Sequence, residues 1–338
     1  MIRKTPDIVH LPFENKPYTQ MYNHLAFFLG IVMGNADKDI TPWLCSRYIN
    51  CRFVESTPQS KFNIILDDPW SSKENLLFKQ NIILEREMFD ALNIDYVNLL
   101  RSMLLQGYYP YGNLNEQYIP GKLSYQRRYY LHDYLLIGFD DEKQCFLSVG
   151  YLKNKKFQEY EIPYECMVNA IKSIESSKIT LGFLEFNKEF DFDLNLRKVK
   201  TELCNYLNST ADMPFLQGRY FGLAAMKQLI GEFENDLNNK KGLDNRYSRG
   251  FMEHKFFMDL RCKYLLNNSY IVSKGITDTA RQVYEMAETV QMLVLKYNIT
   301  LKTDIGQRAI DKMSEILEKE QDYIPLLVKE LEDKRNDA

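Results

Sequence analysis

Residues 131–140 read Leu-His-Asp-Tyr-Leu-Leu-Ile-Gly-Phe-Asp, and this stretch does most to decide the fold. The apolar run within it, Tyr134–Phe139, has the length and composition of a buried β-strand. An Asp-Asp-Glu-Lys turn at 140–143 follows, and Cys145–Val149 reads as the returning strand. The pattern therefore predicts a pair of buried strands with His132 at the entrance.

Alternating strand and helix signals extend from this pair in both directions. Upstream, a helix is predicted over Val97–Gln106, with Gly107 as its C-cap, and a further helix over Met21–Val32. Pro163 suits the first position of a helix that runs to about residue 176. The remaining predicted strands cover 61–66, 108–118, 157–162 and 179–186.

Residues 187–338 differ because apolar residues recur there almost entirely at helical spacing, opposite charged faces. Helices are expected around 221–237, 256–265, 280–294, 305–317 and 326–331. The fold class is therefore α+β: a mixed domain over 1–186, followed by an all-α helical bundle over 187–338.

Composition limits the function classes. The 338 residues are 45% hydrophobic and 26% charged, which is typical of a globular chain, and the net charge of −3 disfavours general nucleic-acid binding. The sequence contains no run of 18 apolar residues, so no membrane span is predicted. The N-terminus shows no signal peptide. The six cysteines contain no CxxC pair, so neither a metal site nor disulfides are expected, and a cytoplasmic location follows.

The order of motifs carries a family resemblance. A helix is followed by Gly107-Tyr108-Tyr109-Pro110, then by Ile119-Pro120, then by His132 and its strand. This arrangement resembles the N-terminal domain of the butirosin biosynthesis protein H family, which has a papain-like cysteine-protease-type fold. It is also similar to the cysteine-protease-like amide synthase of closthioamide biosynthesis. The resemblance covers residues 8–186 and is clearest over 97–175.

The resemblance implies acyl transfer in bacterial secondary-metabolite assembly of the nonribosomal peptide or polyketide type. In that chemistry a cysteine attacks a thioester on the phosphopantetheine arm of an acyl or peptidyl carrier protein, and a histidine activates the thiol. An amine acceptor then opens the acyl-enzyme and forms an amide without ATP. The implied partners are the carrier protein and the amine, and no bound cofactor is implied.

The family's site residues fall on definite positions. The resemblance places the family histidine on His132 and the nucleophile position on Met21, whose thioether cannot accept an acyl group. The third member would fall near Gly150, which has no side chain, so Asn115 or Glu116 is the alternative partner of the imidazole. A non-catalytic relative, a different register or an introduced substitution would each explain Met21.

Other residues near these positions have both a functional and a structural interpretation. The cleft or substrate-binding residues suggested by the resemblance are Tyr22, His24, Tyr111, Tyr130 and Asp133. Lys122 and Arg127-Arg128 either meet an acidic carrier protein or its phosphate, or form solvated surface. Cys45 and Cys51 are the alternative nucleophiles, although they do not begin a helix.

Three functions remain open at this point. The first is an acyltransferase that uses His132, and the second is a pseudoenzyme that binds a carrier protein or biosynthetic partner without chemistry. The third, a peptidase, is disfavoured because no cysteine stands at the nucleophile position. The sequence also leaves open whether the chain forms a homo-oligomer.

Overall fold

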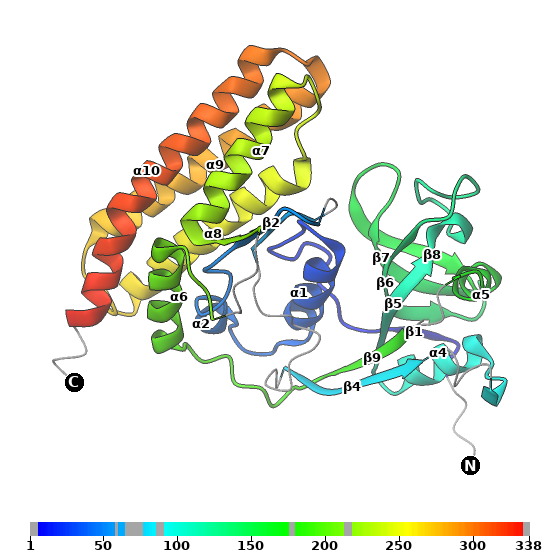
Figure 1. Ribbon diagram of the computed structural model, residues 1–338. Helices are drawn as coiled ribbons and strands as arrows, with labels where there is room; N and C mark the ends of the chain where they lie inside the picture. Colours follow the sequence, from blue (N-terminus) through cyan, green and yellow to red (C-terminus); the bar gives the residue numbers. More distant parts are fainter. Residues whose placement is uncertain are drawn as a thin grey trace. The chain divides into compact units, whose positions relative to one another are not determined.

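The computed structural model describes residues 6–57, 60–64, 77–85, 91–175, 180–212 and 218–333 (Figure 1). The chain forms two compact units, and the first comprises Met1–Asp37 with Pro69–Phe190. The second comprises Lys38–Asp68 with Asp191–Ala338. The mixed α+β class is confirmed by this combination of helices with antiparallel sheets. None of the helices in the described ranges is long and apolar enough to cross a membrane.

An antiparallel sheet forms the centre of the first unit. Its strands follow the order β4-β9-β5-β6-β7-β8, and β1 pairs with β6 outside this path. The strand bounds are β1 Ile8–His10, β4 Phe78–Glu85, β5 Tyr109–Asn115, β6 Leu131–Asp140, β7 Cys145–Tyr151, β8 Phe157–Pro163 and β9 Thr180–Phe186. The predicted β6–β7 pair is confirmed, and the backbone of Lys143 closes its turn by donating to Asp140 Oδ1 at 3.1 Å.

Gly138 explains why a glycine interrupts the apolar run of β6. A Cβ at this position would lie 2.1 Å from the carbonyl oxygen of Val9, so only glycine lets β1 approach β6 at that point. The pairing of β1 with β6 thus depends on Gly138, which lies within residues 131–140.

Two helices pack on one face of the sheet and a third on the other (Figure 1). The first two are α4, Tyr96–Leu105, and α5, Tyr164–Lys172, and they share a core with Tyr134 and Leu136 of β6. The third is α1, Asn23–Asn35, which contacts β6, β7 and β9. The alternation of side chains along a strand accounts for these two buried faces.

Local signals explain the helix ends in this unit. Asp95 caps α4 by accepting from the backbone of Val97 and Asn98, and Gly107 follows the helix with a positive φ of 86°. The predictions of α1 and α4 are confirmed to within a few residues. Pro163 stands at the N-cap of α5 instead of at its first helical position. The end of the strand predicted over 61–66, the end of the helix predicted to reach about 176 and the start of the strand predicted at 179 lie outside the described residues.

The second unit is a set of helices with a small sheet. The helices are α2 Thr41–Leu44, α6 Leu196–Asn208, α7 Gly222–Asn238, α8 Asn245–Asn267, α9 Lys274–Thr300 and α10 Thr303–Asp333. The strands β2 Arg52–Val54, β3 Phe62–Asn63 and β10 Arg219–Phe221 pair in the order β10-β2-β3. Helix α10 continues through Pro325, where the sequence predicted two separate helices.

The expected boundary at 186/187 differs from this division. Residues 38–57 and 60–64 lie in the second unit, although the sequence analysis assigned them to the first domain. The reason is a long-range pairing: β2 pairs along its length with β10, which follows α6 in the chain. The backbone of Gly222 also donates to the carbonyl oxygen of Cys51 at 3.0 Å, which ties this segment to α7.

An ion pair without any exposed surface lies inside the second unit. Lys255 of α8 donates to Glu320 Oε2 of α10 at 2.6 Å, and both side chains are 0% exposed. Tyr206 of α6 donates to the same oxygen at 2.7 Å, and burial raises the pKa of this tyrosine well above its ordinary value. One carboxylate oxygen of Glu320 thus connects α10 with α8 through Lys255 and with α6 through Tyr206.

Candidate acid–base site

The chain between β5 and β6 begins with a short 3-10 turn, η1, over Glu116–Tyr118. Asn115 fixes this turn, because its Oδ1 accepts from the backbone amides of Gln117 and Tyr130, both at 3.1 Å. Its amide donates to Ser173 Oγ at 3.0 Å. Asn115 therefore shapes the backbone that carries Glu116, and its side chain hydrogen-bonds to Ser173, Gln117 and Tyr130.

Glu116 is the residue that contacts the imidazole. Its Oε1 lies 2.8 Å from Nδ1 of His132, and the carboxylate side chain is only 7% exposed while the imidazole is 34% exposed. The pairing of Leu114 with His132 across β5 and β6 brings the two residues together. Of the two alternatives from the sequence, the structure thus brings Glu116 to the histidine.

Lys122 is a third member of this cluster that the sequence analysis did not place in the site. Its Nζ lies 3.4 Å from the same Glu116 oxygen and donates to the carbonyl oxygen of Tyr151 at 2.9 Å. Its side chain is almost fully buried. The ammonium also lies over the ring of Tyr160, 4.7 Å from the centroid, where a cation is attracted to the aromatic face.

Opposing effects determine the charge of Glu116. Burial alone would raise its pKa, but the hydrogen bond from His132 and the charge of Lys122 outweigh burial, so the pKa of Glu116 lies below its ordinary value. Glu116 is therefore ionised at neutral pH and can only accept hydrogen bonds. It follows that Nδ1 of His132 carries the proton, which leaves Nε2 of a neutral imidazole as a proton acceptor.

Met21 does not present its side chain at a surface. It is 2% exposed and precedes α1, whose N-cap is Tyr22 and whose first residue is Asn23. The thioether at the expected nucleophile position is therefore buried core. The ring of Tyr22 stacks on His24, with centroids 5.5 Å apart.

The beginning of α1 reaches the cluster through Asn23. A Cβ on Gly150 would lie 3.3 Å from Lys122 Nζ and 3.8 Å from Asn23 Nδ2, so both side chains lie against this glycine. Asn23 is 4% exposed, and neither polar atom of its amide has a hydrogen-bond partner among the described residues. An unsatisfied buried amide is costly and often marks a binding position.

The other predicted cleft residues do not all lie with His132. Tyr130 lies near its ring, whereas His24 and Asp133 lie near each other. His24 Nδ1 lies 3.9 Å from Asp133 Oδ2, and the ring of Tyr130 lies 5.5 Å from that of His132. Asp133 and His132 are successive residues of β6, so their side chains leave the strand on opposite faces. Tyr111 instead covers Gly182 of β9, where a Cβ would lie 2.0 Å from its ring.

The alternative nucleophiles are poor ones. Cys45 and Cys51 are buried in the second unit, and burial raises the pKa of both thiols, that of Cys45 to about 12. Because the thiolate is the reactive form, these thiols are protonated and unreactive at neutral pH.

No group of three or more histidine, cysteine or acidic residues in the described part of the chain is arranged to hold a metal ion. A scan against protein-family models and a search of curated proteins found no match to this sequence. The assignment of function therefore rests on the geometry of the Glu116–His132 pair.

Proposed function

We propose that the first unit is a papain-like domain that transfers an acyl group from a carrier-protein thioester to an amine, with His132 as the general base. The observation that carries the proposal is the 2.8 Å contact between Nδ1 of His132 and the buried Glu116 carboxylate. A base oriented by a carboxylate, with its second nitrogen unprotonated, is the arrangement that acyl transfer uses.

The proposed reaction forms no acyl-enzyme at Met21, because a thioether has no proton to lose and cannot hold an acyl group. The amine attacks the thioester carbonyl directly, and Nε2 of His132 accepts the proton that the amine loses. The C–S bond then breaks, and the imidazolium returns the proton to the departing thiolate. One C–N bond replaces one C–S bond, and the products are an amide and a free thiol.

Two neighbouring residues support this assignment. Lys122 and the hydrogen bond from His132 keep Glu116 ionised, so the imidazole stays in the tautomer that can accept a proton. We assign to the unpartnered amide of Asn23 the role of a hydrogen-bond donor to the substrate, which would satisfy its buried polar atoms. The carrier protein, its phosphopantetheine arm and a cytoplasmic setting belong to the same proposal.

The proposal is tested by incubating the protein with an acyl-pantetheine thioester and a panel of amines, followed by mass spectrometry. We expect protein-dependent amide and free thiol in equal amounts, while the intact protein gains no acyl mass. A stable acyl adduct on the protein would contradict direct transfer. Absence of amide with every amine would overturn the catalytic assignment.

The burial of Met21 favours one alternative, a pseudoenzyme that binds a carrier protein or biosynthetic partner without chemistry. A thioether packed into the core at the expected nucleophile position is what a catalytically degenerate relative would show. In that case the protein would bind acyl carrier protein or acyl-pantetheine, and the same assay would yield no amide.

A further inference from the structure

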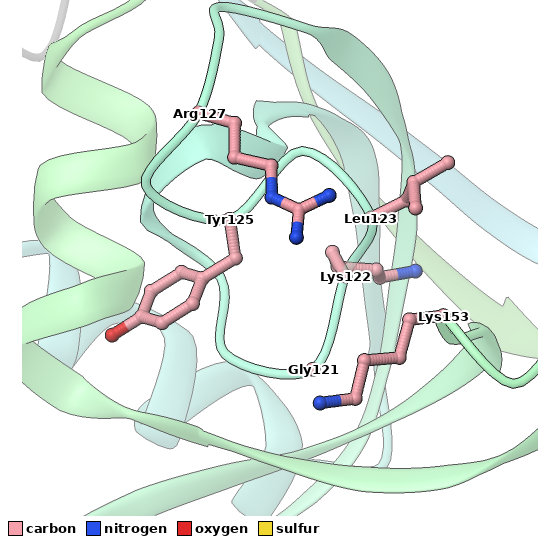
Figure 2. Close-up of a pocket in the computed structure, with 6 residues that line it drawn as sticks. All are labelled: Gly121, Lys122, Leu123, Tyr125, Arg127 and Lys153. Atoms are coloured by element: carbon pink, nitrogen blue, oxygen red, sulfur yellow. The ribbon is translucent and has the colours of Figure 1, made fainter.

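The loop between η1 and β6 encloses a small hollow of about 130 Å3. Six residues line it: Gly121, Lys122, Leu123, Tyr125, Arg127 and Lys153 (Figure 2). Two backbone hydrogen bonds hold its walls, from Gln126 to Gln117 at 2.9 Å and from Lys153 to Gly121 at 2.9 Å. The second bond attaches the β7–β8 turn to the loop, so the hollow has walls from two separate segments.

Two exposed cationic side chains, those of Arg127 and Lys153, line this hollow. Figure 2 shows the guanidinium of Arg127 over the space that the loop encloses and the ammonium of Lys153 below Gly121 at the edge of that space, whereas Lys122 Nζ points away from both. Lys122 is occupied with Glu116 and Tyr151. Within the described parts of the chain, neither Arg127 nor Lys153 forms an ion pair, and no carboxylate lines the hollow.

This charge arrangement favours an anion. Two like charges that line one small concave space repel each other, and a bound anion reduces that repulsion while it accepts charge-assisted hydrogen bonds. Arginine next to lysine is a combination suited to phosphate, because the guanidinium binds two oxygens and the ammonium adds a point charge. A carboxylate in the wall would have neutralised the pair, and the wall has none.

We propose that the hollow between Arg127 and Lys153 binds the phosphate group of a phosphate ester. Lys122 connects it to the acid–base site, because its residue forms part of the wall while its ammonium lies 3.4 Å from Glu116. The phosphate ester that the proposed function supplies is the phosphopantetheine arm of a carrier protein. The identity of the ester as this arm rests on the proposed function, whereas phosphate binding does not.

The binding test uses calorimetric titration of the whole protein with pantetheine 4′-phosphate, unphosphorylated pantetheine and inorganic phosphate. We expect the phosphorylated compound to bind about tenfold or more tightly than pantetheine, since hydrogen bonds to a charged phosphate are stronger than those to a neutral hydroxyl. The double variant Arg127→Gln/Lys153→Gln should lose this difference. Binding of inorganic phosphate alone would support the site and remove the pantetheine arm as its ligand.

The matched control is Lys156→Gln/Lys188→Gln, which removes the same charge at two exposed lysines of the first unit outside the hollow. It should retain the preference for the phosphorylated compound. Equal loss in both double variants would overturn the proposal, because bulk charge would then explain the binding. Equal affinity of the parent for pantetheine and its phosphate would overturn it as well.

The amide assay separates this inference from the proposed function. If both hold, Arg127→Gln/Lys153→Gln should lose turnover with a phosphorylated thioester donor and keep it with an acyl-N-acetylcysteamine donor. Phosphate binding without any amide formation would refute only the proposed function. Amide formation with no preference for the phosphorylated compound would refute only the phosphate site.

Discussion

Replacement of His132 by alanine is expected to slow amide formation by about 10²–10⁴-fold, the usual contribution of a positioned general base. The variant removes the acceptor of the amine proton but leaves the sheet intact, because the imidazole is one third exposed and near the end of β6. The measurement is the initial rate of amide formation with an acyl-pantetheine donor at neutral pH.

His10 provides a matched control for this variant. The Nε2 atom of His10 lies 3.2 Å from Glu159 Oε2, so these residues also form a histidine–carboxylate pair in the first unit. Unlike Glu116, the carboxylate of this pair is substantially exposed, and so is the imidazole. His10→Ala should therefore retain the parent rate. Glu116→Gln should show an intermediate loss, because the amide keeps the shape but not the charge that stabilises the imidazolium. Equal rates for the parent and His132→Ala would remove His132 from the mechanism.

Replacement of Lys255 by methionine is expected to lower the free energy of unfolding of the helical unit by about 3–5 kcal/mol. The variant leaves the Glu320 carboxylate, which is 0% exposed, without its cationic partner in the interior. The hydrogen bond from Tyr206 remains but cannot balance the charge. The measurement is the denaturant unfolding curve, followed by far-ultraviolet circular dichroism.

The double variant Lys255→Met/Glu320→Met distinguishes a buried unpaired charge from simple loss of packing. It should recover much of the stability, because replacing both members of a buried pair with apolar residues removes the desolvation cost. Lys312→Met, which removes a partly exposed partner of Glu315, should change the stability by less than about 0.5 kcal/mol. A double variant less stable than Lys255→Met would show that the pair itself provides the stability.

The sequence predicted the first unit best where its signals are local. The capped helix before Gly107 and the strand pair around the turn at 140–143 were both found within a few residues, because capping, turn residues and apolar runs are properties of short segments. The small β10-β2-β3 sheet was missed as a sheet, since its pairing joins segments far apart in the chain. Tertiary packing likewise carries α10 through Pro325, where proline predicts a break.

The candidate site was predicted only in part. The sequence predicted His132 before an apolar strand and offered Asn115 and Glu116 as its possible partners. The structure distinguishes them, because Glu116 contacts the imidazole. Lys122 was interpreted as a contact of a carrier protein or its phosphate, or as solvated surface, and Asn23 was not singled out. Their burial depends on the three-dimensional arrangement around Gly150, and no local pattern reports that a lysine or an asparagine is enclosed.

The most direct test of the account is the tautomer of the neutral His132 imidazole, measured at alkaline pH in a long-range nitrogen–proton correlation spectrum of the protein. The chain has four histidines, and comparison with His132→Ala assigns the relevant signals. The account predicts a protonated Nδ1 and an unprotonated Nε2, a preference that Glu116→Gln weakens. A proton on Nε2, or the mixture of tautomers that a free imidazole shows, would contradict it.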